Sequence, residues 1–261
     1  SELQANEVIN DVNLDADDTT DEVFRLDRTT GAILGSFSYE KNIQYLALAV
    51  DPADGAILGS HVSGGNEKVL RIVTPGTTGD TVLWDYRSRF GWTRTEAMAF
   101  YLRPFTGAEG SLYAIASTGK TLYSVSPLSG QATPITEADE ALGATLTSLA
   151  YSALRHTLYY TDAPDADGDF RLYRYDLSAG EHEKIGELNG GNFAYTVTQP
   201  PVNLACLNGD LFFVHRQSDD LVRISLDGDS IGSITKVADI GSDQVSFTTV
   251  GDLSVRDDGV L

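Results

Sequence analysis

One pattern recurs five times along this chain, and it decides the fold. A large apolar residue precedes a small one in the segments Leu48-Ala49-Val50, Met98-Ala99-Phe100, Leu149-Ala150-Tyr151, Leu204-Ala205-Cys206 and Leu253-Ser254-Val255. Their spacings are 50, 51, 55 and 49 residues, and the path from the last segment through the C-terminus and from Ser1 to Leu48 adds another 56. A repeat that closes on its own ends is typical of a circular array of sheets, so the sequence predicts an all-β, five-bladed β-propeller.

The stretch 147–188 shows most clearly what one repeat contains. Side chains alternate with a period of two in 147–153, 157–162, 170–177 and 183–188, and residues such as Gly, Asp and Ser separate these runs. Such alternation predicts four antiparallel strands joined by hairpin turns, which make one blade. The same reasoning places the strands of the last repeat at 202–207, 210–216, 221–226 and 235–240.

The repeats divide one domain, residues 1–261, into five predicted blades. The first combines 247–261 with 1–38, and the others cover 43–86, 96–135, 146–188 and 202–240. A blade shared by the two ends of the chain ties both termini into one sheet and leaves no open edge. Small residues in the repeated segments have a packing reason, because inner strands converge near the axis of such a ring. A single helical turn is predicted at 137–142.

Composition narrows the classes of partner. Hydrophobic residues make up 41% of the chain, enough for a core, and the formal net charge of -20 argues against nucleic acid and anionic membranes as partners. Asp outnumbers Glu 26 to 12. That bias fits either a surface adapted to salty water or loops that hold a hard cation such as calcium. The single cysteine, Cys206, excludes an intramolecular disulfide, and its place in a repeated segment predicts a buried small hydrophobe.

Three segments carry a family resemblance: TLYYTD at 157–162, SLYAIASTGKTLYSVSPLSG at 111–130 and VFRLDRTTG at 23–31. They resemble secreted and cell-surface bacterial β-propeller repeat proteins of the YWTD and NHL type. The resemblance extends over the whole chain but rests on motifs that make the fold. It implies a propeller that is usually extracellular, and it carries no catalytic residue.

An acidic loop is the first candidate site. Four carboxylates, Asp162, Asp165, Asp167 and Asp169, fall within eight residues around Gly168. Alternating Asp residues at a Gly turn can converge oxygens on one point, which is what calcium needs. The alternative is an acidic, solvated turn. A second acidic group, Asp11, Asp15, Asp17, Asp18 and Asp21, occupies the equivalent region of the first blade, close to a terminus, and is interpreted as solvated.

The mouth of the central channel is the second candidate. The residues that precede the repeated segments are Ala47, Ala97, Ser148, Asn203 and Asp252, and the last three carry oxygen. The stretches 251–255 and 203–212 resemble inner strands of olfactomedin-type five-bladed propellers. That family holds a channel cation with an Asp and an Asn, which match Asp252 and Asn203. This chain departs from the family because it lacks the cysteine pair, and the third acidic ligand falls on Ala47 or Ser148. Alternatively, Asn203 and Asp252 bind backbone groups at strand ends.

A connection rich in aromatic and cationic residues is the third candidate. It contains Trp84, Arg87, Arg89, Trp92 and Arg94, which include both tryptophans of the chain. Exposed aromatic rings beside arginines can stack on sugars or bind a peptide carboxylate, so these residues are candidate ligand contacts. The alternative is that the two tryptophans fill the gap between blades. The longest loop, 189–201, could rim a pocket on the same face.

Catalytic signals are weak. The four histidines show no metal-type spacing, and the sequence contains no P-loop or cysteine–histidine motif. Only Glu96 and Asp252 place carboxylates at inner ends of blades, where glycoside hydrolases of this architecture need two. Whether the chain is an enzyme therefore stays open, with a non-enzyme favoured.

The leading hypothesis is an extracellular or cell-surface, non-catalytic binding module. It would engage carbohydrate or protein through the loop-rich face, as an adhesin or receptor-binding domain does, with calcium stabilising the loops. One alternative is a glycoside-active enzyme on the same fold. Another is a structural subunit of a pilus, virion or surface layer, in which the flat sides make the contacts.

Overall fold

A computed structural model describes most of the chain. The described residues are 7–12, 22–27, 29–38, 45–50, 57–63, 66–72, 81–85, 95–101, 111–116, 121–126, 131–135, 145–152, 154–201, 204–215, 217–241 and 250–255. Within these ranges the regular structure is entirely β-strand, in twenty strands. Across the same ranges, no helix is long and apolar enough to span a bilayer. The helical turn predicted at 137–142 lies outside them.

The strands form five four-stranded antiparallel sheets in the described residues, each with its strands in chain order apart from one. Two sheets are β4 (Tyr45–Val50), β5 (Ile57–Ser63), β6 (Asn66–Ile72), β7 (Thr81–Asp85) and β8 (Thr95–Tyr101), β9 (Ser111–Ala116), β10 (Leu122–Val125), β11 (Ala132–Pro134). Two more are β12 (Leu146–Ser152), β13 (Thr157–Asp162), β14 (Arg171–Asp176), β15 (Glu181–Glu187) and β16 (Ala205–Leu207), β17 (Asp210–His215), β18 (Asp220–Asp227), β19 (Ser230–Asp239).

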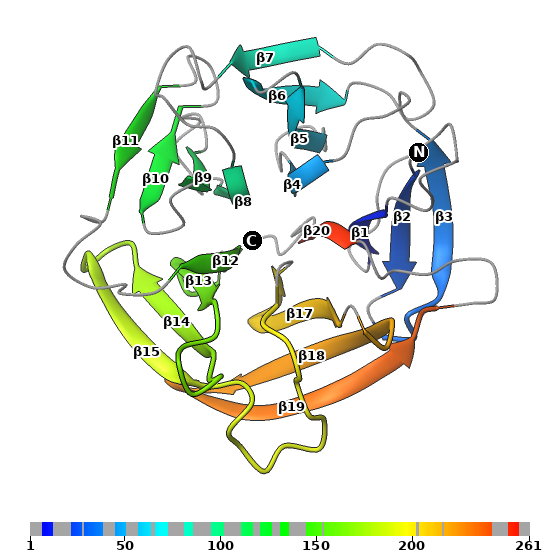
Figure 1. Ribbon diagram of the computed structural model, residues 1–261, viewed down its shortest axis with the longest axis vertical. Coiled ribbons are helices and arrows are strands. Elements are labelled where there is room, and N and C mark those ends of the chain that lie inside the picture. Colours follow the sequence, from blue (N-terminus) through cyan, green and yellow to red (C-terminus); the bar gives the residue numbers. More distant parts are fainter. Residues whose placement is uncertain are drawn as a thin grey trace.

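The fifth sheet combines both ends of the chain. Its order is β20 (Val250–Val255), β1 (Glu7–Val12), β2 (Glu22–Asp27), β3 (Ile33–Ser38), and β20 pairs antiparallel with β1. Figure 1 shows the five sheets around a common centre, with β20 in red beside β1 in blue. The innermost strands contact one another in the sequence β20, β4, β8, β12, β16 and back to β20.

The sequence placed most strands of the two best-described sheets within two residues of their observed limits. It was wrong about the last outer strand, predicted at 235–240, because β19 already begins at Ser230. A two-residue turn at Gly228 and Asp229, with a φ of 60° at Gly228, extends the hairpin. Two register shifts between β18 and β19 absorb the extra residues, and such bulges leave no simple alternation to read from sequence.

Two turns between third and fourth strands use one sequence motif, an Asp followed by Gly four residues later. The Asp27 carboxylate accepts hydrogen bonds from the backbone N–H groups of Thr29 and Thr30, both at 2.8 Å. In the second turn, the Asp176 carboxylate accepts equivalent bonds from the backbone N–H groups of Ser178 and Ala179, at 2.7 and 2.9 Å. The glycines that follow, Gly31 and Gly180, have φ values of 70° and 72°, which only glycine adopts readily. These two sheets therefore share the residues that form the turn as well as the order of their strands.

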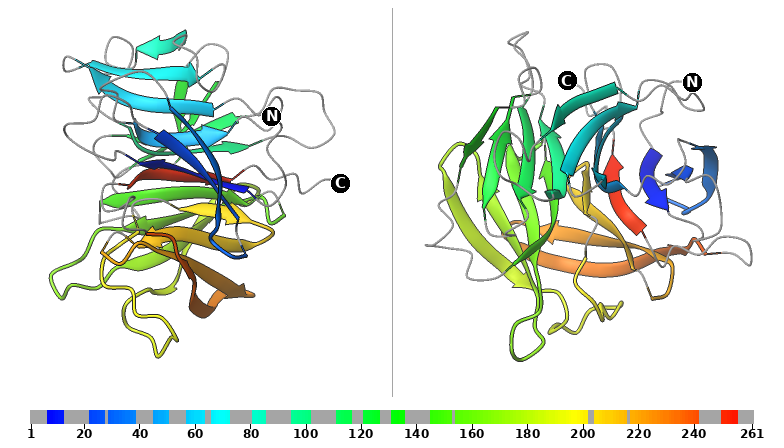
Figure 2. Two further views of the ribbon diagram at one scale, coloured as in Figure 1. Left: turned by 90° about the vertical axis from the view of Figure 1, so that its right-hand side faces the viewer. Right: turned by 45° about the horizontal axis from the view of Figure 1, so that its top comes forward.

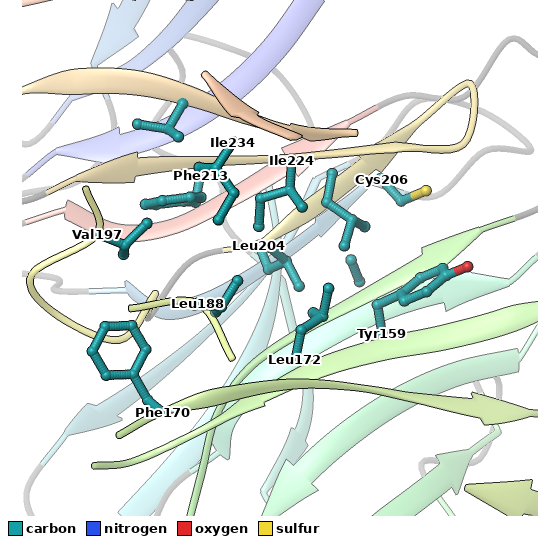
Figure 3. Packing of buried hydrophobic residues seen from close by; sticks show 13 residues of the cluster. Tyr159, Phe170, Leu172, Leu188, Val197, Leu204, Cys206, Phe213, Ile224 and Ile234 are labelled. Carbon is teal, nitrogen blue, oxygen red and sulfur yellow. The ribbon is translucent and has the colours of Figure 1, made fainter. Parts of the chain in front are cut away.

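The core lies in wedges between neighbouring sheets. Between the β12–β15 and β16–β19 sheets, Leu172, Leu211, Val222 and Ile224 are fully buried, and Figure 3 shows this cluster. The small residues Ala150 and Ala205 of the repeated segments are also buried, at 2% and 3% exposure, as their proposed packing role requires. Each fully buried Leu or Ile contributes about 1.5–3 kcal/mol.

Two further clusters link this half of the molecule to its neighbours. One joins β9 and β10 to β12 and β13 through residues such as Ile115 and Tyr160, and the other joins Leu26 of β2 to the β16–β19 sheet. Cys206 is buried in the wedge, as predicted for a small hydrophobe.

Candidate functional site

The strand order gives the molecule two faces with different connections. We call the segments 163–170, 188–201 and 217–219 the loop face, because they join second to third strands or one sheet to the next and so leave the same strand ends. The short turns 154–156, 177–180, 208–209 and 228–229 leave the opposite ends. Figure 1 and Figure 2 show loops 163–170 (green) and 188–201 (yellow) side by side.

Asp162 begins the predicted calcium loop, and its carboxylate is engaged by protein groups. The residue is fully buried. Its Oδ1 accepts a hydrogen bond from the backbone N–H of Arg171 at 2.5 Å. Its Oδ2 accepts bonds from the Tyr173 hydroxyl at 3.1 Å and from the Arg171 guanidinium at 3.3 Å. Burial, followed by the nearby Asp162 carboxylate, raises the pKa of Tyr173, so this hydroxyl remains a donor.

Asp165 organises the tip of the same loop. Its Oδ1 accepts hydrogen bonds from the backbone N–H groups of Asp167 and Asp169, both at 3.0 Å, and its Oδ2 pairs with the Arg171 guanidinium. The hydrogen bond from Arg171 and those from the two backbone groups lower the pKa of Asp165. Asn189 then ties this loop to the next, since its side-chain amide donates to the Gly168 carbonyl at 2.9 Å.

The cation that the structure places at this loop is Arg171. Its guanidinium lies between Asp162 and Asp165. Among the described residues, no group of three or more His, Cys, Asp or Glu side chains could hold a metal ion. Asp167 and Asp169 follow in the loop, and calcium at these four residues stays a prediction. Sequence reasoning counted the acids and overlooked the arginine that begins the next strand.

The channel-mouth residues are only partly within the described structure. Asn203 lies outside it, and Asp252 lies in β20, where the backbone alone is described. Ser148 is fully buried and its hydroxyl is bonded to that of Thr161 in the paired strand. The neighbouring Thr147 donates to the Pro201 carbonyl at 2.8 Å, which fastens the end of loop 188–201 to β12. A channel cation at Asn203 and Asp252 also stays a prediction.

A β-bulge recurs at one position of the repeat. Register shifts fall between Tyr45 and Ala47, between Thr95 and Ala97, and between Leu146 and Ser148. The extra residues are Leu46, Glu96 and Thr147, each two positions before the repeated Leu or Met. β20 also has an irregularity, opposite Asn10 and Val12 of β1, that includes Asp252. Bulges of this kind re-aim side chains at strand ends, often beside functional sites.

The aromatic and arginine candidates are largely outside the described ranges. Trp84 lies in β7, paired with Val69 of β6. Arg87, Arg89, Trp92 and Arg94 fall in 86–94, which the structure does not describe. Their role as ligand contacts therefore stays a prediction.

The loop 188–201 is fastened to the β16–β19 sheet through Tyr195. Its backbone N–H donates to the Ile234 carbonyl at 3.1 Å. Its hydroxyl donates to Asp220 Oδ2 at 2.8 Å and lies 2.9 Å from the Ser218 hydroxyl. Burial raises the pKa of Tyr195 to about 12, so the phenol stays protonated and can donate.

A second attachment involves Thr198 and His215. The Thr198 Oγ1 lies 2.9 Å from Nε2 of His215, and Nδ1 of that ring lies 3.0 Å from the Ser218 hydroxyl. Ser218 donates to Asp220 Oδ2 at 2.7 Å, and Lys236 forms an ion pair with Oδ1. Sequence reasoning assigned His215 no role, because Thr198, which contacts one side of its ring, comes from a separate loop.

The ionisation states in this network follow from its contacts. Burial alone would raise the pKa of Asp220, but hydrogen bonds from Lys236, Ser218 and Tyr195 outweigh it and lower the value. Burial lowers the pKa of His215, and the nearby Asp220 carboxylate opposes that shift only in part. At neutral pH the network therefore contains a carboxylate and a neutral imidazole.

The loop tips remain exposed while their bases are held. Ala166, Asp167, Asn192, Ala194 and Thr196 are all exposed. They present small side chains, backbone groups and a carboxylate to solvent from a bonded framework. Such a surface offers hydrogen bonds and contact area to a ligand.

Comparisons with known proteins identify the fold. No protein-family model and no curated protein matches the sequence. A structure described as a nidogen/laminin complex aligns with a TM-score of 0.59 over 96% of this chain and 99% of that chain, at 11% identity. A protein of unknown function from Bacteroides thetaiotaomicron aligns at 0.59, with 14% identity, over 99% of this chain and 67% of its own. TolB from Acinetobacter baumannii aligns at 0.54, with 14% identity, over 88% and 52%.

Identities this low carry the fold alone. The alignments agree with the antiparallel four-stranded sheets, so the chain has a β-propeller fold of repeated blades. This confirms the propeller part of the resemblance seen in the sequence.

Proposed function

We propose that the chain is a closed, five-bladed β-propeller that serves as a non-catalytic binding module through its loop face. The ligand would be carbohydrate or protein, outside the cell or at its surface. The observation that carries the proposal is the fastening of two long loops, 163–170 and 188–201, whose tips nevertheless stay exposed.

Strand contacts support the ring. The innermost strands contact their neighbours in a cycle that returns to β20, and β20 pairs with β1 from the other end of the chain. A closed ring gathers the ends of all sheets on two opposite faces. Loops from different connections can then form one continuous surface, as 163–170 and 188–201 do through Asn189.

Preorganisation supports binding on this face. Loops that are already ordered lose less conformational entropy when a ligand binds, and more of the contact energy then appears as affinity. In loop 163–170, Asp165 holds two backbone N–H groups and Arg171, and in loop 188–201 Tyr195 and Thr198 bind the neighbouring sheet.

Partner class and location rest on the net charge, one similar structure and the resemblance in the sequence. The nidogen/laminin neighbour is described as a complex with a protein, at an identity that carries the fold alone. The net charge of -20 favours neutral or cationic partners over nucleic acid. Together with the resemblance to secreted propellers, these points favour an extracellular protein or glycan as ligand.

Arrays of immobilised glycans and of purified extracellular proteins test the proposal. The labelled full chain should bind at least one class of probe. Ala166→Arg and Ala194→Arg, at two exposed tips, should weaken binding at least tenfold without changing the melting temperature. Ala179→Arg is the matched control, because Ala179 is also exposed but lies in a turn of the opposite face. Equal loss in the control variant, or no bound probe at all, would contradict the proposal.

A glycoside-active enzyme is the second candidate, and the recurrent bulge favours it. Glu96 is the extra residue of the bulge in β8, and Asp252 lies in the corresponding irregularity of β20. The two residues are therefore at equivalent ends of two innermost strands. A pair of carboxylates is what glycoside hydrolysis needs. Turnover of a panel of aryl glycosides that disappears in Glu96→Gln, with the fold retained, would establish the enzyme and displace the binding module.

A further inference from the structure

The network around His215 has a defined direction of donation. Tyr195 and Ser218 both donate to Asp220 Oδ2. Because the single hydroxyl proton of Ser218 goes to Asp220, the contact between Ser218 and Nδ1 of His215 requires the ring to donate there. Nε2 of a neutral ring is then left as the acceptor.

The Thr198 backbone N–H donates to that acceptor, and the Thr198 hydroxyl lies beside it. The Thr198 hydroxyl lies 2.9 Å from Nε2 and the Thr198 backbone N–H lies 3.4 Å from it. The hydroxyl has a second acceptor available, the Gln217 side-chain oxygen at 3.0 Å. The backbone N–H has only the ring nitrogen among its described partners.

A second proton on His215 therefore affects the two contacts differently. The hydroxyl can rotate toward Gln217 and accept a bond from the new N–H. The backbone N–H cannot reverse, so it faces a donor and loses its partner. We propose that His215 is a pH-sensitive latch that holds loop 188–201 on the β16–β19 sheet while neutral and releases the segment around Thr198 when protonated. The latch regulates the loop face, and in that sense it rests on the proposed function.

Other parts of the loop limit the movement. Val197 is 1% exposed and packs in the wedge with Phe213, as Figure 3 shows. Pro201 accepts hydrogen bonds from Thr147 and Thr161 at 2.8 and 3.0 Å. Release therefore loosens a short segment between fixed points, with the sheets unchanged.

The surroundings of His215 favour its neutral form when the latch is closed. The charged groups of the network are Asp220 on β18 and Lys236 on β19, which pair with each other, and Lys236 also lies 3.7 Å from Asp239. Among the described residues, Asp219 in the adjoining turn and Tyr195, whose pKa is raised by burial, are the other titratable groups close to the ring. Burial lowers the pKa of His215, and the Asp220 carboxylate opposes that shift only in part.

The sign of the pH dependence follows. A histidine with a lowered pKa in the closed state stabilises that state above its ordinary value and loses this contribution as pH falls. Opening should therefore increase by about tenfold for each pH unit below about 6.5, until the closed-state ring also titrates.

Amide hydrogen exchange of the full chain tests the latch without any ligand. Exchange of the Thr198 and Gln199 amides, normalised to the unfolded chain, should increase as pH falls from 7.5 to 5, by about tenfold for each pH unit below about 6.5 until the closed-state ring also titrates. In His215→Gln the pH dependence should disappear. His182→Gln, at an exposed position of β15, is the matched control and should behave as wild type.

A measurement on the wild type covers the case in which His215→Gln does not fold. The NMR titration midpoint of the His215 ring should coincide with the levelling of the exchange increase. Exchange of the Thr198 and Gln199 amides that is independent of pH, or that changes equally in β17, would overturn the latch. Failure to find a ligand would contradict the proposed function and leave this result intact.

Discussion

Gly31 shows how one residue fixes the distance between two sheets. Its φ of 70° suits glycine, and a Cβ there would lie 2.9 Å from Cγ2 of Ile240 and would overlap the side chain of Ala238. The turn after β2 therefore packs directly on the end of β19 and the residue that follows it. The position needs glycine for both its backbone conformation and its lack of a side chain.

Gly31→Ala should consequently destabilise the protein by more than the strain of a left-handed backbone conformation alone. We expect a loss of about 2–4 kcal/mol in the free energy of unfolding, from left-handed strain and overpacking together. Gly228→Ala is the control, because Gly228 has a φ of 60° with open space around its Cβ position. It should cost about 1–2 kcal/mol. Equal losses in urea denaturation would show that no close contact exists at Gly31.

Arg171 is the residue that changes the interpretation of the acidic loop. Arg171→Met removes the guanidinium. The fully buried Asp162 then keeps two donors, the backbone N–H of residue 171 and the Tyr173 hydroxyl. We expect a loss of about 1–3 kcal/mol, since a buried charge loses a partner. Lys184→Met, which breaks an exposed pair with Glu187, should cost under about 1 kcal/mol. A melting temperature unchanged by Arg171→Met would contradict the geometry.

The same melting curves, recorded with and without chelator, test the calcium prediction separately. A fall on chelation that calcium restores would support metal at 162–169. Superimposable curves would leave Arg171 as the cation of this loop.

Single elements were well predicted wherever alternation was regular. The strand 157–162 was placed at its observed limits, and β14 and β17 were placed to within one residue at each end. β19 was not, because bulges and a two-residue turn break its period. The loop networks could not be predicted at all. Tyr195, Thr198, His215 and Asp220 are brought together by the fold, and no spacing in the sequence records that contact.

The wedge between the β12–β15 and β16–β19 sheets gives the prediction at this scale. Ile224 is fully buried there, so Ile224→Ala removes apolar contacts and leaves a cavity. We expect a loss of about 2–5 kcal/mol in the free energy of unfolding. Leu154→Ala, at a residue 75% exposed, should change stability by less than about 0.5 kcal/mol. A small loss for Ile224→Ala would mean that these sheets do not pack as described.

At the scale of the whole molecule, the repeat spacing alone predicted a propeller, because 49 to 55 residues between similar segments is the length of a four-stranded unit. The 56 residues that join the last segment to the first predicted that the ends share a sheet, and β20 and β1 do pair. Function could not be derived in the same way. The repeat describes what the blades have in common, whereas binding depends on the loops in which they differ.

Cross-linking of the two ends tests the central claim most directly. Ile9 and Ser254 are register partners in β1 and β20, so Ile9→Cys with Ser254→Cys, in a Cys206→Ala background, should form a disulfide on mild oxidation. The control pair, Phe24→Cys with Ser254→Cys, lies one strand further apart and should remain reduced, because Phe24 faces Asn10 of β1 from β2. Mass spectrometry should find residues 9 and 254 joined in the native protein, with a higher melting temperature. Two free thiols in the Ile9 and Ser254 variant, under conditions where the protein is folded, would contradict the closed ring.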